Sequence, residues 1–172
     1  MDRFAPNLPG GGLLGGTSID VVVALDDPRS PDVQALLAVH LAFAREVTPP
    51  CEVHALDVEG LLDPMVSLFS ARREGVVLGI GALRELDPVH GEIKSMHTAE
   101  TARGQGVGRA IVDHLLAVAA ERGYRRVSLE TGATPEFAPA RALYAGAGFE
   151  QCAPFGDYVE DLNGTCMTRL LA

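Results

Sequence analysis

The chain contains no tryptophan, and phenylalanine and tyrosine bring its aromatic content to only 5%. Basic residues are also scarce, because 14 Lys and Arg stand against 23 Asp and Glu, which gives a formal net charge of −9 at pH 7. Nucleic-acid binding draws on a basic surface, so this balance argues against a nucleic-acid partner. It still leaves room for a local basic pocket that binds a small anion.

Cysteines and long apolar runs are few as well. Cys51, Cys152 and Cys166 are an odd number without CxxC spacing, which indicates reduced thiols, no disulfide framework and no metal site. No run approaches the roughly 18 apolar residues that mark a membrane span, and the N-terminus leads into Pro9 and three glycines rather than an apolar signal region. We therefore expect a cytoplasmic protein without a membrane partner.

The 172 residues suit one domain with its own core. Residues 1–17 are rich in Gly and Pro without periodicity, so we expect a flexible segment there and a single domain over residues 18–172. The predicted elements are strand 19–25, helix 31–48, short helix 58–62, strands 65–71, 76–86 and 92–98, helix 106–122, strand 127–131, helix 139–147, and strands 150–155 and 166–171. This mixed order predicts an α/β (α+β) fold about one sheet.

A glycine-rich loop, Arg103-Gly104-Gln105-Gly106-Val107-Gly108, lies between a predicted strand and a predicted helix. Glycines let backbone N–H groups approach a ligand, and the start of the helix adds its positive dipole. The loop is therefore suited to a pyrophosphate, with Arg103 and Arg109 adding charge. It does not fit the dinucleotide pattern GxGxxG, because Arg109 occupies the third glycine position, and the chain has no Gly-Lys pair for a Walker loop.

Three segments together resemble the GCN5-related N-acetyltransferase (GNAT) superfamily. The loop has the spacing R-x-x-G-x-G, residues 92–98 resemble the family's fourth strand, and residues 140–149 match A-x-x-L-Y-x-x-x-G-F. Segments 53–57, 128–132 and 152–158 further resemble a bacterial group of YsnE-type acetyltransferases. The resemblance implies the GNAT fold, a mixed and mostly antiparallel sheet of six to seven strands flanked by about four helices. It also implies acetyl-CoA as co-substrate, with no metal.

The family pattern carries the cofactor site onto this chain. It implies that backbone groups of Met96, His97 and Thr98 pair with the pantetheine arm of CoA. The loop residues implied to bind the cofactor are Arg103, Gly104, Gln105, Gly106, Val107, Gly108, Arg109 and Ala110, and those from Gln105 to Ala110 are implied to hold the pyrophosphate. The chain departs from the pattern at Phe137, where many members carry an asparagine that contacts the CoA arm.

Two residues match catalytic positions of the family. Tyr144 matches the tyrosine that protonates the leaving thiolate, and a phenol is protonated at pH 7; packing in the core is the alternative. Glu92 falls where histone-type members keep a general base, and a charge paired with Lys94 is its alternative. Strand alternation predicts Glu92, Lys94 and Met96 on one sheet face and His97 on the other, where packing is its expected role.

The acceptor site is predicted less specifically. Its candidate residues are Lys94, His54, Glu130, Asp157 and Tyr158, although the acidic ones also suit a solvated loop. We expect direct transfer of acetyl to a primary amine of a small molecule through a ternary complex. The alternatives are acetylation of protein lysines or N-termini, or an acyl-CoA-binding regulatory module without catalysis. The resemblance also admits a homodimer.

Overall fold

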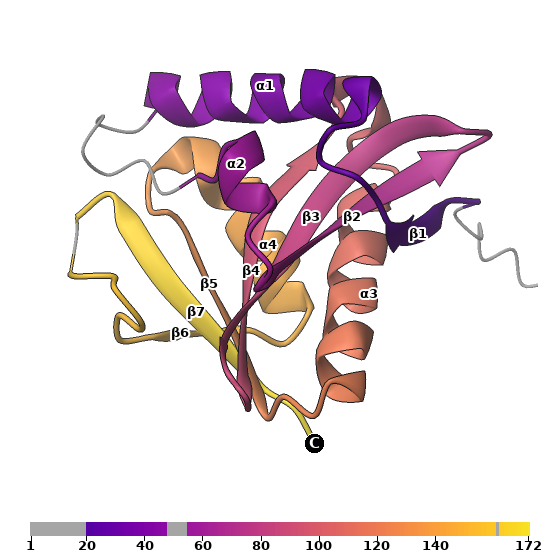
Figure 1. Cartoon of the computed structure of the whole chain (residues 1–172). Coiled ribbons are helices and arrows are strands. Elements are labelled where there is room, and N and C mark those ends of the chain that lie inside the picture. The colour runs from indigo at the N-terminus through magenta and orange to yellow at the C-terminus, as the bar shows by residue number, and fades with distance from the viewer. Residues whose placement is uncertain (1–19, 48–54, 161) are drawn as a thin grey trace, which may run out of the picture.

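The computed structural model describes residues 20–47, 55–160 and 162–172. Seven strands of this part form one sheet in the order β1-β2-β3-β4-β5-β7-β6 (Figure 1). Their bounds are β1 Val22–Leu25, β2 Val66–Arg73, β3 Val76–Asp87, β4 His90–Thr98, β5 Arg126–Gly132, β6 Glu150–Cys152 and β7 Gly164–Leu170. β4 and β5 run parallel, and the other neighbouring pairs run antiparallel. The predicted mixed, mostly antiparallel sheet is confirmed.

Helices cover both faces of the sheet. α1 (Pro31–Val47) and α2 (Val58–Leu61) lie on one face, and α3 (Val107–Glu121) packs on the other, next to α4 (Ala138–Gly146). Two 3-10 turns, η2 (Glu100–Ala102) and η3 (Pro135–Phe137), precede α3 and α4. These four helices agree with the predicted number.

Each face has its own apolar core because side chains alternate along the strands. In β2, Leu68 packs with Leu37 of α1, whereas the next residue, Phe69, packs with the α3 side. Ile111 and Leu115 of α3 are fully buried in the second of these cores. Apolar burial on both faces therefore holds the sheet between the two helical layers.

Several predicted boundaries shift by a few residues. β2 continues through Arg73, so the turn to β3 is limited to Glu74 and Gly75, which both have positive φ angles (50° and 84°). β6 ends at Cys152, three residues earlier than predicted. The predicted helix at 139–147 begins at Ala138, after the turn η3.

One alternation prediction is wrong. The β3–β4 register shifts between Ile80 and Ala82, since Ala82 pairs with Lys94 but Ile80 pairs with His97. The extra residue lies on β4, where Ser95 has a φ of 53°, and it forms a β-bulge. As a result His97 lies on the α1 face with Lys94, and Met96 packs on the α3 face.

The parallel strands β4 and β5 separate part way along their length. Pairing runs from His90 with Arg126 to Ile93 with Leu129, and it ends there. Residues 94–98 of β4 and 130–132 of β5 are therefore not paired with each other. This separation leaves strand edges in the middle of the sheet that face a cavity.

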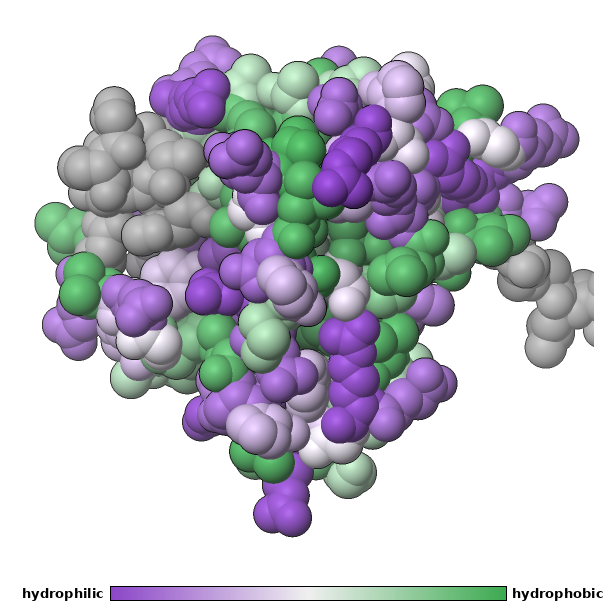
Figure 2. Space-filling view, in the orientation of Figure 1, coloured by the Kyte–Doolittle hydropathy of each residue, from purple (hydrophilic) through white to green (hydrophobic). Residues whose placement is uncertain are grey.

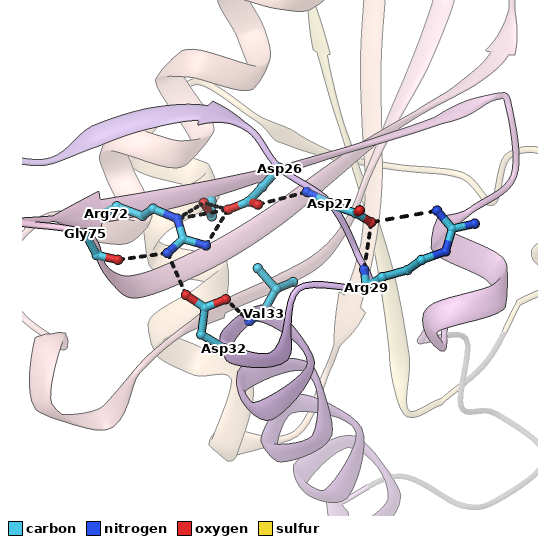
Figure 3. Close-up of polar contacts among 8 residues, drawn as sticks. Asp26, Asp27, Arg29, Asp32, Val33, Arg72 and Gly75 are labelled. Atoms are coloured by element: carbon cyan, nitrogen blue, oxygen red, sulfur yellow. Dashed lines mark hydrogen bonds and ion pairs between the residues drawn. The ribbon is translucent and has the colours of Figure 1, made fainter.

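A network of charged side chains links α1 to the sheet at the edge formed by β1 and β2 (Figure 3). Arg72 of β2 bonds the carboxylate of Asp26, which follows β1, at 2.8 Å and that of Asp32, in the first turn of α1, at 2.6 Å. Its Nη1 also donates to the carbonyl of Gly75 in the β2–β3 turn. Ser70 donates a further hydrogen bond to Asp26. One guanidinium thus joins three chain segments.

The outer surface carries groups of both polarities. On the face drawn in Figure 2, hydrophilic side chains are spread widely, with smaller hydrophobic groups between them. Among the described residues, none of the helices combines the length and apolar character that crossing a membrane requires.

Candidate functional site

A cavity of about 550 Å³ lies where β4 and β5 separate. The loop before α3 and residues of α1 both line it. Its other walls come from residues 93–98 of β4, from residues 130–132 of β5, and from Pro139, Ala140, Leu143 and Tyr144 of α4. The cavity therefore connects the predicted cofactor loop with the predicted acceptor side.

The glycine loop has the conformation that anion binding requires. Gly104 and Gly106 have φ angles of 70° and 80°, in the left-handed region that favours glycine. Gly106 is the N-cap of α3, and the first turn of that helix carries no acidic residue. The first amides of α3 have no carbonyl of their own helix to bond, so they and the helix dipole can receive a phosphate.

Six of the eight loop residues predicted to bind the cofactor line this cavity. These are Arg103, Gly104, Gly106, Val107, Gly108 and Arg109, whereas Gln105 and Ala110 do not line it. The Gln105 side chain instead donates to the carbonyl of Thr101 and accepts from Arg73. Arg109 bonds Asp113 and the carbonyl of Gly146, which directs its guanidinium toward α4.

The bulged part of β4 forms the central wall. Met96, His97 and Thr98, the residues expected to carry the pantetheine arm, all line the cavity. Because β4 does not pair with β5 here, one side of this strand segment has no strand neighbour. A bound arm with amide groups could pair with it as an added strand does.

Tyr144 of α4 also lines the cavity, although it is only 5% exposed. Burial, and secondarily the negative charge of Glu130, raise the pKa of the Tyr144 phenol above its usual value of 10.0. The hydroxyl therefore stays protonated near neutral pH. A protonated phenol at this position can donate to a thiolate that forms in the cavity.

Glu92 is buried and does not itself line the cavity. Its Oε1 accepts a hydrogen bond from the hydroxyl of Tyr158 at 2.6 Å and one from Nζ of Lys94 at 3.2 Å. Arg84 lies 3.7 Å from its other oxygen. The carboxylate is thus connected to the cavity by its hydrogen bonds with Tyr158 and Lys94, which both line the cavity.

Tyr158 and Lys94 also contact each other. Lys94 donates to the Tyr158 hydroxyl oxygen at 2.7 Å, and its Nζ lies 5.3 Å from the centre of the ring. Burial, followed by the charge of Glu92 and its hydrogen bond, raises the pKa of Tyr158 above 10.0. The phenol therefore keeps its proton near neutral pH and donates a hydrogen bond to Glu92.

Of the remaining predicted acceptor residues, the structure places Glu130 on the cavity wall and Asp157 away from it. His54 lies outside the described residues. Cavity residues that sequence reasoning missed include His40, Phe43 and Asn163. The available signal for His40 was its place between Leu37 and Ala44 on the inward side of α1, where a polar residue is unusual.

Phe137, which stands where many family members have asparagine, also lines the cavity. Its ring packs directly on the backbone of Gly132, where an added Cβ would overlap it. The same ring meets Phe43 of α1 edge-on, with 5.4 Å between ring centres. The departure from the family pattern therefore makes this wall aromatic in a chain that is otherwise poor in aromatic residues.

Together, the separated parallel strands, the glycine loop at the start of α3 and the buried tyrosine of α4 define an acyl-CoA-dependent acyltransferase. The sequence profile of the acetyltransferase (GNAT) family matches residues 33–149. The chain belongs to this family. The family match confirms the class predicted from the loop, the fourth strand and the L-Y-x-x-x-G-F segment.

Individual relatives agree. The chain is 42% identical over 149 residues to the uncharacterized N-acetyltransferase YsnE of Bacillus subtilis, covering 87% of this chain and 99% of that protein. It is 32% identical over 143 residues to a protein of Azospirillum brasilense named IAA acetyltransferase, covering 83% and 92%. A crystal structure of an acyl-CoA N-acyltransferase from Klebsiella pneumoniae matches with a TM-score of 0.74 and 24% identity over 90% of this chain and all of that one.

Proposed function

We propose that the protein transfers an acetyl group directly from acetyl-CoA to a primary amine of a small molecule. The observation that supports this proposal is the single cavity that joins the phosphate-binding loop, Tyr144 and the acceptor wall. A continuous space allows both substrates to be held at once, as a ternary complex requires.

The residues present fit CoA. The unpaired edge of residues 94–98 suits the pantetheine arm, and the glycine loop with the first amides of α3 suits the pyrophosphate. Bound acetyl-CoA supplies the activated thioester. A solved GNAT structure from Elizabethkingia anophelis, with a TM-score of 0.67 and 18% identity over 88% of this chain and 99% of that one, contains acetyl-CoA.

Direct transfer is favoured over a route through an enzyme thiol. Of the described cysteines, Cys152 and Cys166 do not line the cavity. Burial first, then the neighbouring Cys152, raises the pKa of Cys166 to about 11, which lowers its thiolate fraction at neutral pH. An amine that attacks the thioester itself needs no such nucleophile.

We assign Tyr144 the role of proton donor to the leaving sulfur. Glu92 remains the base predicted from the sequence, and a proton would reach it from the cavity by way of the Tyr158 hydroxyl. Lys94, Glu130 and Tyr158 are the proposed acceptor contacts. A small molecule suits this cavity because Phe43 and His40 of α1 line it and contact the rings of Phe137 and His97, which gives it an aromatic wall.

The proposal is tested by thiol release from acetyl-CoA across a panel of small amines, amino acids and lysine-bearing peptides, with product masses determined. The expected result is acetylation of at least one small amine at its nitrogen. Turnover with peptides alone would favour a protein acetyltransferase. CoA binding without thiol release for any amine would favour a regulatory module.

A further inference from the structure

The structure brings two histidines from different elements together at the cavity. His40 of α1 and His97 of β4 have ring centres 5.4 Å apart, and both rings line the cavity. The bulge at Ser95 makes this contact, because regular alternation would direct His97 to the opposite face. The proposed function assigns a role to the backbone of His97 but none to its side chain.

The Nε2 atom of His97 is buried and has no hydrogen-bond partner. The residue is only 9% exposed. A buried polar atom without a partner costs roughly 1–3 kcal/mol, so such atoms indicate that a ligand or water completes the site. Here the atom belongs to a ring on the cavity wall, one residue from Thr98 and Met96, the segment expected to hold the thioester end of CoA.

We propose that His97 receives the proton that the acceptor nitrogen loses during acetyl transfer, supported by the His40 ring packed against it. The proposal rests on the proposed function and deepens it, because it makes His97, in place of the sequence-predicted Glu92, the group that takes this proton directly. Glu92 does not line the cavity and is reached through Tyr158, whereas His97 is itself one of the residues that line it.

The step balances. The acceptor nitrogen forms a bond to the acetyl carbon, the carbon–sulfur bond breaks, and its electron pair goes to sulfur. The nitrogen's proton passes to Nε2 of His97, and sulfur takes the proton of the Tyr144 hydroxyl. Exchange with water then returns His97 to its neutral form and Tyr144 to its protonated form.

Both rings are in the form that can accept a proton. Burial, and secondarily the charge of Arg103, lower the pKa of His97 below its usual 6.5. Burial, and secondarily His97, lower the pKa of His40 to about 4. Both are therefore neutral near pH 7. The other charged groups around the cavity are Lys94 on β4, Glu130 on β5, Glu136 in η3 and Arg109 in α3, with Glu92 behind Lys94.

The test measures kcat against pH at saturating acetyl-CoA and saturating acceptor for the full-length protein and three variants. His97→Gln keeps hydrogen-bonding capacity without a titrating ring, Glu92→Gln does the same for the sequence-predicted base, and His114→Gln is the control. His114 lies in α3, packs against Phe69 and does not line the cavity. The Kd for CoA, from calorimetry, reports whether each variant still folds and binds.

The wild-type kcat should fall as pH drops through the pKa of His97, below 6.5. His97→Gln should lower kcat near neutral pH by about 10²-fold. Its kcat should no longer fall at acidic pH, and its Kd for CoA should equal that of the wild type. In Glu92→Gln and His114→Gln, kcat should still fall at acidic pH. A His97→Gln variant with wild-type kcat and pH profile would overturn the proposal, as would loss of the fall in Glu92→Gln alone.

Two further measurements keep the proposal testable if glutamine disturbs the site. Added imidazole should restore formation of the amide product by His97→Ala, and the rate should saturate as the imidazole concentration rises. Failure to restore it counts against the proposal. The ring resonance of His97, assigned by its absence in the variant, should titrate at the same pH as the acidic fall in kcat. If no amine supports thiol release, the proposed function fails, whereas turnover that ignores His97 refutes only this inference.

Discussion

The side-chain nitrogen of Lys94 lies 2.7 Å from the hydroxyl oxygen of Tyr158, and that hydroxyl donates to Glu92 at 2.6 Å. A strand residue and a residue of the loop after β6 thus share one buried carboxylate, although they are 64 positions apart in sequence. Both residues line the cavity, and the loss of their shared contact should therefore change binding of the proposed acceptor rather than of CoA.

Tyr158→Phe should weaken acceptor binding and leave CoA binding unchanged. The ring stays, Lys94 keeps its 3.2 Å contact with Glu92, and only the shared hydroxyl is lost. The acceptor KM should rise about 2- to 10-fold, the worth of one hydrogen bond, with the Kd for CoA unchanged. Steady-state kinetics with varied acceptor measure this, and an unchanged acceptor KM would remove Tyr158 from the proposed contacts.

Gly106→Val should abolish CoA binding. The position has a φ of 80°, and a β-branched side chain would both strain it and cover the first amides of α3. Gly75→Val is the matched control, since its φ is 84° and an added Cβ there meets nothing within 4 Å. Calorimetry should show loss of CoA affinity in Gly106→Val only. Equal losses in both variants would mean that backbone strain, rather than the covered amides, weakens CoA binding.

Tyr144→Phe should lower kcat about 10²-fold and leave the Kd for CoA unchanged, because the ring remains and the proton donor is lost. Tyr124→Phe is the control. Its hydroxyl bonds Glu85 at 2.9 Å and the residue does not line the cavity, so kcat should stay at the wild-type value. Wild-type turnover in Tyr144→Phe would make that tyrosine a packing residue.

Arg72→Met should destabilise the fold by about 1–3 kcal/mol, because the carboxylate of Asp26 then stays half-buried without its guanidinium partner (Figure 3). The pair with Asp32 adds less, since that carboxylate is about half exposed. Urea unfolding measures the change. Arg29→Met, which breaks an exposed 4.0 Å pair with Asp27, should change nothing measurable.

The same network predicts an acid-sensitive stability. Burial alone would raise the pKa of Asp26, but hydrogen bonds from Ser70 and Arg72 outweigh it and lower the pKa below 3.8. The Arg72 hydrogen bond likewise lowers the pKa of Asp32. Their contribution is therefore complete above about pH 4 and is lost as pH falls through the lowered values. The free energy of unfolding of Arg72→Met should depend less on pH in this range.

Local patterns were sufficient for the elements and for the backbone conformation of the glycine loop. Gly104 and Gly106 signal left-handed backbone by residue type alone, and the apolar period that includes Ile111 and Leu115 marks α3. Both signals act within a few residues of the chain. The class of the protein followed from three such local segments in the right order.

Tertiary structure alone decided how the wall of the proposed acceptor site is assembled. The bulge at Ser95 arises from pairing between β3 and β4, so alternation read along β4 placed His97 on the wrong face. The contacts of His40 with His97, of Phe43 with Phe137 and of Tyr158 with Glu92 each join segments far apart in the chain. Sequence determined which groups the chain carries, whereas their distances depend on strand register and on how α1 packs across the separated strands, and no local pattern encodes either.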